Sequence, residues 1–174
     1  MASSTRSTAQ AKSSKPTSPA GRATSTSSRT TSTSTTSRPV VVALGSNLGD
    51  RRRTLLRAIH EMRGVIRVVR ISSMYQTDAV DAPPGSPPFL NMVMAGLTRC
   101  SPEELLHELL SIEVRLGRVR RGRNAPRTID LDLIFYSGRT QRTRELTLPH
   151  PRYRDREFVM GPLRELGIYP QRVP

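Results

Sequence analysis

The sequence predicts an α+β sandwich, within the broad α/β class, whose elements follow the order β-α-β-β-α-β. Three observations predict it. The chain contains apolar runs rich in β-branched residues, as in strands of a sheet. Two further segments repeat apolar residues every three or four positions, and each is preceded by a helix-capping residue.

The first half of the domain supplies a strand, a helix and a second strand. The apolar run PVVVALG ends at Gly45 and predicts a buried strand. Asp50 can cap a helix that ends near Gly64. The apolar residues of that helix recur at helical spacing: Leu55, Ile59 and Met62. The stretch VIRVVRISSMYQT predicts one strand, and the Pro- and Gly-rich DAVDAPPGSPP predicts a loop after it.

The second half repeats the alternation. FLNMVMAGL predicts a third strand, and TIDLDLIFY predicts a fourth. Between them, Ser101 and Glu104 form a capping box with Pro102 in the first turn of a helix. The apolar face of this helix comprises Leu105, Leu109, Ile112 and Leu116. The complete order is the split βαβ, ferredoxin-like arrangement.

The N-terminal residues 1–38 differ sharply from the rest of the chain. They hold 22 Ser and Thr, six basic residues and no acidic residue. Such a segment buries too little surface to offset its chain entropy, so we expect a disordered tail before a domain at 39–174. An Arg- and Ser-rich leader without acids also fits an organellar transit peptide. The bias toward Arg over Lys suggests a cytoplasmic protein. The alternative is an organelle, if residues 1–38 are a transit peptide.

Composition excludes several classes of protein. The single Cys excludes a disulfide framework and a Cys-rich zinc site. No apolar run reaches the length of a membrane helix, so no membrane partner is expected. The net charge of +14 suits either a nucleic acid or a polyphosphate, and charge alone does not separate the two.

Two carboxylates in the fourth strand are the sharpest chemical signal. Side chains alternate along a strand, so Asp130 and Asp132 point to one face while Leu131 points to the other. Two like charges this close resist joint ionisation unless a cation lies between them. Mg²⁺ prefers carboxylate and phosphate oxygens. The pair therefore suits a magnesium–nucleotide site, and the alternative is a solvated strand face.

Arginines gather in the stretch that leads into this strand. The cluster comprises Arg118, Arg120, Arg121, Arg123 and Arg127. A guanidinium group can donate two hydrogen bonds to a pair of phosphate oxygens, and a metal can link the same phosphates to the carboxylates. A nucleic-acid patch is the alternative, but paired aspartates would repel a phosphate backbone. These features favour a polyphosphate ligand.

Other local features are weaker. Gly45 follows the first strand, where a residue without a side chain allows close approach to a ligand. Phe89 and Asn91 share one strand face, which suits a flat heteroaromatic ligand, although core packing of Phe89 is the alternative. His150 lies in a predicted turn, where a lone His is more often structural.

Taken together, the motifs resemble one family, the hydroxymethyl-dihydropterin pyrophosphokinases of folate biosynthesis. The matching stretches are ALGSNLGD, SSMYQTDAV, PPFLNMV, IEVRLGRVR, NAPRTIDLDLIFY and LTLPHPRYRDREFVMGPL. The resemblance implies the ferredoxin-like fold. It also implies transfer of pyrophosphate from ATP to 6-hydroxymethyl-7,8-dihydropterin, with release of AMP and two Mg²⁺ as cofactors.

The resemblance also implies roles for individual residues. Asp130 and Asp132 match the magnesium ligands, and Arg118 and Arg127 match catalytic arginines. The positions that match the ATP site are Glu113, Arg118, Arg127, Thr147, His150 and Arg156. The positions that match the pterin site are Gly45, Asn47, Thr77, Phe89, Asn91 and Phe158.

Other readings and expectations accompany this one. The chain could be a C-terminally shortened relative with weak or no activity, or a nucleic-acid-binding module of the same fold. The second lacks the aromatic pattern that RNA-binding sheets use. Segments 78–88 and 118–127 are expected to close over the substrates. Oligomeric state and the individual roles of Arg120, Arg121 and Arg123 stay open.

Overall fold

The computed structural model describes residues 36–79, 83–119 and 125–169. Most of the predicted tail, together with Arg120, Arg121 and Arg123, lies outside the described residues. The strands are β1 (Arg38–Ser46), β2 (Ile66–Ile71), β3 (Tyr75–Thr77), β4 (Phe89–Thr98), β5 (Asp130–Tyr136), β6 (Gln141–Arg142) and β7 (Thr147–Leu148). The helices are α1 (Arg51–Met62), α2 (Pro102–Arg115) and α3 (Glu157–Glu165).

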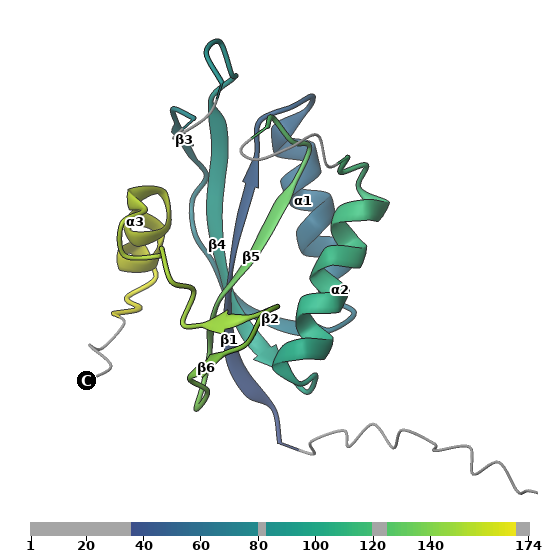
Figure 1. Ribbon diagram of the computed structural model, residues 1–174, viewed down its shortest axis with the longest axis vertical. Helices are drawn as coiled ribbons and strands as arrows, with labels where there is room; N and C mark the ends of the chain where they lie inside the picture. The colour runs from purple at the N-terminus through teal and green to yellow at the C-terminus, as the bar shows by residue number, and fades with distance from the viewer. Residues whose placement is uncertain (1–35, 80–82, 120–124, 170–174) are drawn as a thin grey trace, which may run out of the picture. The chain divides into compact units, whose positions relative to one another are not determined.

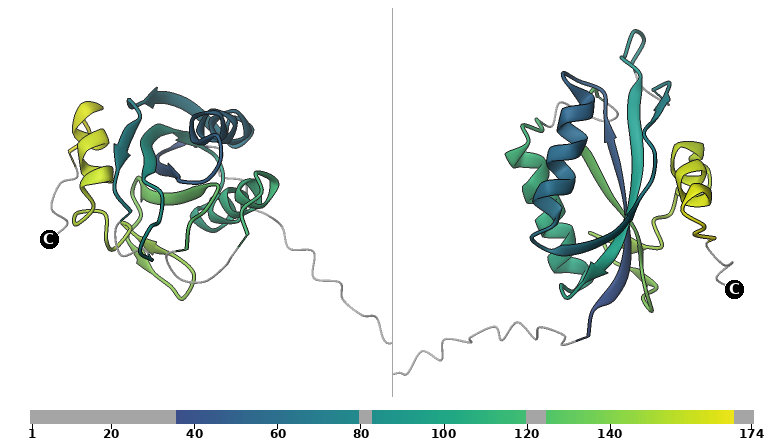
Figure 2. Two further views of the ribbon diagram at one scale, coloured as in Figure 1. Left: turned by 90° about the horizontal axis from the view of Figure 1, so that it is seen from above. Right: turned by 180° about the vertical axis from the view of Figure 1, so that it is seen from behind.

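The main sheet has the strand order β2-β4-β1-β5, and β3 pairs with β4 beside β2. All of these pairings are antiparallel. Helices α1 and α2 lie on one face of the sheet, as Figure 1 shows. Helix α3 lies on the opposite face (Figure 2). The predicted fold class is confirmed, while α3 and the β6–β7 pair add to the predicted elements.

The helix face of the sheet holds the larger apolar core. Val42 and Leu44 of β1 point into it and are at most 1% exposed. Leu55 of α1 and Leu109 of α2 meet them there, both fully buried. Both predicted caps form: the Asp50 carboxylate accepts from the N–H of Arg53, and the capping box at the start of α2 is complete.

The α3 face has a smaller core that covers part of the sheet. Val159 and Leu163 of α3 pack against Val93 and Ile134. On this face the side chains of β1 shrink along the strand, from valine at 41 through alanine at 43 to glycine at 45. At the end of β1 nearest the predicted site, β1 therefore carries no large side chain on this face of the sheet.

The structure differs from the sequence prediction in the stretch VIRVVRISSMYQT. This stretch forms two strands, β2 and β3, rather than one. At the break, the N–H of Val93 donates to the hydroxyl of Ser72 at 2.9 Å instead of to a strand carbonyl. The side chain has replaced the backbone as acceptor, so the ladder is interrupted. The fourth predicted strand also starts later, at Asp130.

Candidate functional site

Two cavities meet at the paired aspartates. The first cavity has a volume of about 380 Å³ and lies on the α3 face of the sheet. The second has a volume of about 330 Å³ and is bounded by α2, β5 and β7. Among the described residues, Asp130 and Asp132 are the ones that line both.

The predicted site residues divide between these cavities. Those that line the first are Gly45, Thr77, Phe89, Asn91, Arg127, Arg156 and Phe158. Those that line the second are Glu113, Arg118, Thr147 and His150. The residues predicted for a pterin and most of those predicted for a nucleotide are thus separated by the aspartate pair. Arg127 and Arg156 were predicted for the nucleotide but line the first cavity.

Strand register places the aspartates. In the antiparallel pairing of β5 with β1, Asp130 lies opposite Gly45 and Asp132 lies opposite Ala43. Leu131 and Leu133 point to the other side and are buried in the helix-face core. The alternation predicted for this strand is therefore confirmed, and the small residues of β1 leave the carboxylates uncovered.

Arginines hold both carboxylates. Asp130 accepts from Arg118 at 2.6 Å and from Arg127 at 3.0 Å. Asp132 accepts from Arg156 at 2.9 Å. The three guanidinium groups thus face the two neighbouring carboxylates with opposite charge.

The donor set fits magnesium in one particular way. Within the described part of the chain, no group of three or more His, Cys, Asp or Glu side chains is arranged to hold a metal. Mg²⁺ commonly uses one or two protein carboxylates and completes its shell with water and substrate phosphates. Asp130 and Asp132 suit that kind of site, in which the nucleotide supplies the remaining oxygens.

A buried glutamate binds Arg118 in the wall of the second cavity. Glu113 is 2% exposed, and its Oε1 accepts from the N–H of Leu131 at 2.8 Å and from Arg118. Burial raises the pKa of Glu113, while the bonds from Leu131 and Arg118 act in the opposite direction. Burial alone would lower the pKa of Arg118, but the charges of Asp130 and Glu113 outweigh it, and that pKa is raised. Arg118 therefore remains a cation at the mouth of the second cavity.

His150 is partly buried in the wall of the second cavity. Its ring Nδ1 accepts from the backbone N–H of Arg152 at 3.2 Å, and the backbone N–H of His150 donates to the carbonyl of Ile134 at 3.0 Å. Burial lowers the pKa of His150 by more than the charge of Asp132 raises it. Both observations favour a neutral imidazole, which can contact a ligand without adding charge.

Two aromatic rings line the first cavity from different layers. Phe89 comes from β4 and Phe158 from the first turn of α3. The guanidinium carbon of Arg127 lies 6.0 Å from the centre of the Phe89 ring, and that of Arg156 lies 5.6 Å from the centre of the Phe158 ring. Because each arginine also binds an aspartate, both rings are linked to the carboxylate pair.

The floor of the first cavity depends on a glycine. Asn91 is 5% exposed, and its side-chain amide donates to the hydroxyl of Thr77 at 2.8 Å. Gly45 lies opposite Asn91 in the β1–β4 pairing. A Cβ atom at position 45 would lie 2.8 Å from the Asn91 Oδ1, too close for a normal contact. Because Gly45 has no Cβ atom, the Asn91 amide can occupy its position in the cavity wall.

Asn47 does not line either cavity, unlike the other predicted pterin residues. It is 2% exposed, and its Oδ1 accepts from the N–H of Arg127 at 2.7 Å. Its amide nitrogen donates to the carbonyl of Pro87 at 3.1 Å. The family resemblance implied a place for Asn47 in the wall of the pterin pocket, and in the structure its side chain binds two loop ends beside the site.

Several lining residues escaped the sequence analysis. Asp78, Arg152, Asp155 and Glu157 also line the first cavity. Two of them, Asp155 and Glu157, adjoin Arg156 in the chain, and that proximity was a usable signal. Leu106 and Leu110 of α2 line the second cavity together with Glu113. Their spacing of four and three residues places all three on one helix face, which the sequence could have revealed.

Comparison with known proteins gives consistent matches. The family model described as 7,8-dihydro-6-hydroxymethylpterin-pyrophosphokinase matches residues 41–168. A 2-amino-4-hydroxy-6-hydroxymethyldihydropteridine pyrophosphokinase of Bacillus subtilis is 40% identical over 127 residues, covering 72% of this chain and 75% of the relative. The mitochondrial folate synthesis bifunctional protein of Arabidopsis thaliana is 41% identical over 132 residues, or 75% of this chain.

The lengths of these relatives differ. The chain spans 24% of the Arabidopsis protein, so it corresponds to about a quarter of that bifunctional relative. Among solved structures, a Plasmodium falciparum HPPK-DHPS triple mutant with STZ-DHP aligns with a TM-score of 0.63 at 13% identity. That alignment covers 80% of this chain and 41% of the other, and it supports the fold alone.

Proposed function

The chain belongs to the 7,8-dihydro-6-hydroxymethylpterin-pyrophosphokinase family, and on that premise we propose that it transfers pyrophosphate from ATP to 6-hydroxymethyl-7,8-dihydropterin. AMP and the pterin diphosphate are the products. The family and the class of enzyme expected from the sequence motifs are thereby confirmed. We place this activity in folate biosynthesis, because the name of the Arabidopsis relative includes folate synthesis.

The shared aspartate pair is the observation that carries this proposal. A transfer between two substrates needs two binding sites that meet where the group moves. The first cavity offers two rings and an amide for a flat pterin, and the second offers Arg118, Thr147 and His150 for a nucleotide. Both open onto Asp130 and Asp132, so the pterin hydroxyl and the ATP phosphates would meet there.

Asp130 and Asp132 would hold magnesium together with the ATP phosphates. Mg²⁺ bound there supplies Lewis-acid stabilisation of phosphoryl charge. Arg118 and Arg127 lie against Asp130, within reach of phosphate oxygens at the same place. Guanidinium groups bind such oxygens in pairs, so these two arginines would stabilise the charge that builds up on the transferred group.

The remaining residues orient the acceptor. Phe89 and Phe158 would enclose the pterin ring from two sides, and Asn91 would donate or accept at its edge. Enclosure between rings also excludes water, which competes with the acceptor for the phosphoryl group. Positioning of this kind accounts for much of the catalysis in phosphoryl transfer.

A direct assay tests the proposal. The full chain is incubated with ATP, Mg²⁺ and 6-hydroxymethyl-7,8-dihydropterin, and AMP is measured by chromatography. AMP should form only when the pterin is present, which separates transfer from hydrolysis of ATP. Folded protein that yields no AMP under these conditions would contradict the proposal.

The cellular location is also a proposal. Among the described helices, none has the length and apolar character needed to cross a membrane. Two plant relatives carry the word mitochondrial in their names. We propose the cytoplasm, with organellar import as the alternative directed by residues 1–38. Fusing those residues to a fluorescent protein and following it in plant cells decides between the two.

A further inference from the structure

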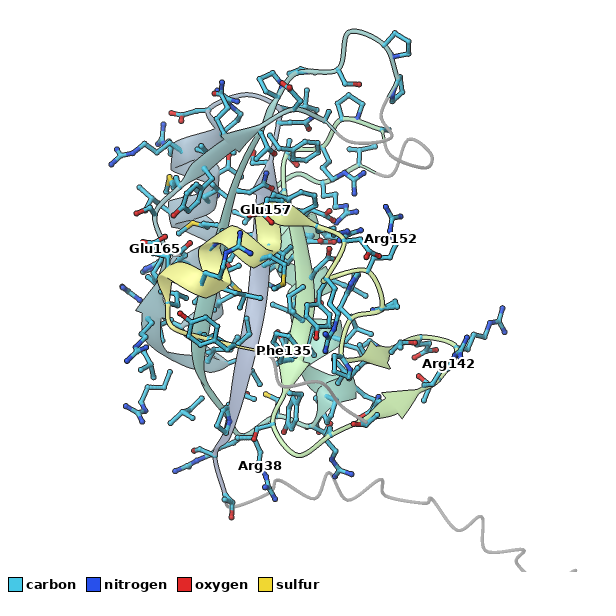
Figure 3. The ribbon with its side chains drawn as sticks, turned by 90° about the vertical axis from the view of Figure 1, so that its left-hand side faces the viewer. Arg38, Phe135, Arg142, Arg152, Glu157 and Glu165 are labelled. Atoms are coloured by element: carbon cyan, nitrogen blue, oxygen red, sulfur yellow. The ribbon has the colours of Figure 1, made fainter. Side chains whose placement is uncertain are left out.

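The last residue of α3 bonds to the turn between β2 and β3. The Glu165 carboxylate accepts from the N–H of Ser73 at 2.9 and 3.0 Å and from the Ser73 hydroxyl at 2.9 Å. It also accepts from the Tyr75 hydroxyl at 2.7 Å. We call this group, Glu165 with Ser73 and Tyr75, the α3 latch. Figure 3 labels Glu165 and Glu157 at the two ends of the helix.

The α3 latch lies outside the proposed site. Glu165, Ser73 and Tyr75 are absent from the lining of both cavities, so none of them is placed to touch a substrate. The latch nevertheless joins two elements that both contribute residues to the lining of the first cavity. Helix α3 carries Phe158 in its first turn, and β3 carries Thr77.

Strand β3 transmits the connection directly to the cavity floor. Tyr75 pairs with Asn91 across β3 and β4, and Thr77 pairs with Phe89. Thr77 also accepts the hydrogen bond from the Asn91 amide. The bonds between α3 and Tyr75 therefore also fix the position of Phe158 relative to Phe89 and Asn91.

The other described contacts of α3 fix it to different parts of the molecule. Val159 and Leu163 pack on the sheet through apolar contacts, which are not directional. At the same end as the latch, a guanidinium nitrogen of Arg70 donates to the carbonyl of Leu166 at 2.6 Å. Just before the helix, Arg156 binds Asp132 of β5 at 2.9 Å. The Glu165 carboxylate instead binds Ser73 and Tyr75 through charge-assisted, directional hydrogen bonds, so it is the contact suited to set the position of α3 relative to β3.

We infer that Glu165 is a positioning residue that sets the distance between Phe158 and the Phe89–Asn91 wall and thereby controls pterin affinity. The inference rests on the proposed function, because the occupant of the first cavity is taken to be the pterin. Without the latch, α3 would be fixed in place only when the pterin binds. The free-energy cost of fixing it would then lower the affinity for the pterin. The second cavity is built from α2, β5 and β7. Arg156, the predicted nucleotide residue at the start of α3, is held by Asp132 rather than by the latch, so ATP binding should change less than pterin binding.

Steady-state kinetics of Glu165→Gln test this. We expect the KM for the pterin to rise about three- to tenfold, as for loss of one or two hydrogen bonds, with the KM for ATP and kcat nearly unchanged. Tyr75→Phe removes one donor and should give a smaller rise in the same constant. Glu61→Gln is the matched control, because Glu61 is also a partly exposed partner in a contact between elements, here with Arg115 of α2.

The results separate this inference from the proposed function. Wild-type protein without pterin-dependent AMP formation would overturn the proposed function and the inference with it. An active wild type with an unchanged pterin KM in Glu165→Gln would overturn the inference alone. An equal loss in both substrate constants, or in Glu61→Gln, would show a general loss of structure and would also reject it. Should Glu165→Gln not fold, the pterin KM of Tyr75→Phe decides.

Discussion

The two faces of the main sheet are built from alternate residues of the same strands, yet they hold different kinds of side chain. Along β1, Val40, Val42 and Leu44 face α1 and α2 and are all buried in one apolar core. The residues between them face α3, and they become smaller toward the end of the strand. One face is filled with side chains along its length, and the other is filled for part of its length.

The difference shows how a single sheet combines stability with chemistry. The helix face is continuous apolar packing, which contributes stability in proportion to the area it buries. The α3 face gives up that packing over the stretch where Gly45, Asn91 and Asp130 lie side by side across three strands. Substitutions on the helix face should therefore lower the free energy of unfolding, and substitutions on the α3 face should lower activity.

The largest expected effect is at the aspartate pair. Asp130→Asn or Asp132→Asn should lower kcat about a thousandfold, since a bound metal contributes several kcal/mol of charge stabilisation and each 1.36 kcal/mol is tenfold in rate. The measurement is AMP formation at saturating substrates, with circular dichroism as the check on folding.

Glu108→Gln is the control for this pair, because it removes one negative charge from an exposed position on α2. Its kcat should match that of the wild type. Turnover near normal in either aspartate variant would reject the assignment of the pair to magnesium.

A glycine on the helix face should affect stability and leave the chemistry alone. A Cβ atom at Gly96 would lie 2.4 Å from Ile66 Cγ2 and 2.7 Å from the carbonyl oxygen of Arg67. Backbone atoms must move to admit it, so Gly96→Ala should lower the free energy of unfolding by about 1–3 kcal/mol. Urea denaturation measures this loss, and both KM values should be unchanged well below the midpoint. A stable but inactive variant would break the division between the two faces.

The same substitution on the α3 face should do the reverse. In Gly45→Ala the new methyl group meets Asn91 Oδ1, the end of a side chain rather than backbone. Displacing that amide should raise the KM for the pterin about tenfold, within the range of other steric misfits in packed sites. The urea midpoint should change less than in Gly96→Ala. Equal destabilisation by the two substitutions would show that both faces are packed alike.

The smallest effect concerns acid stability. Hydrogen bonds from Ser73, followed by that from Tyr75, hold the pKa of Glu165 below its usual value of 4.5. A lowered pKa in the folded state gives stability that is present above about pH 4.5 and is lost as the pH falls through the folded pKa. Wild type should therefore exceed Glu165→Gln in thermal midpoint at pH 6, and the gap should close toward pH 3. A gap independent of pH would contradict this account of the latch.

Local sequence signals predicted the elements that they control directly. The capping box at Ser101 and the cap at Asp50 both form, because each is made by residues within one turn of the helix. The alternation around Asp130 was equally readable, since strand geometry alone decides which side chains share a face. The division of the other site residues between two cavities depends on the pairing of strands far apart in sequence, and no local pattern carries it.

The rest of the fold depended on long-range contacts. The break between β2 and β3 arises from a hydrogen bond between Ser72 and Val93, which no property of the stretch itself announces. Helix α3 has Pro162 within it, a residue that argues against a helix when the sequence is read alone. The resemblance assigned Asn47 to the pterin pocket, and its bonds to Pro87 and Arg127 depend on segments distant in the chain, which the motif does not show.

The lack of a side chain at Gly45 also limits which substitutions could make the protein resistant to an inhibitor. A glycine can only be replaced by something larger, and at this position the added atoms collide with Asn91. Under the proposed function, a substitution at Gly45 that displaces a compound bonded to the Asn91 amide would also weaken binding of the pterin. Escape would have to come from the walls, on α3 and the loops, where side chains can vary without filling the cavity floor.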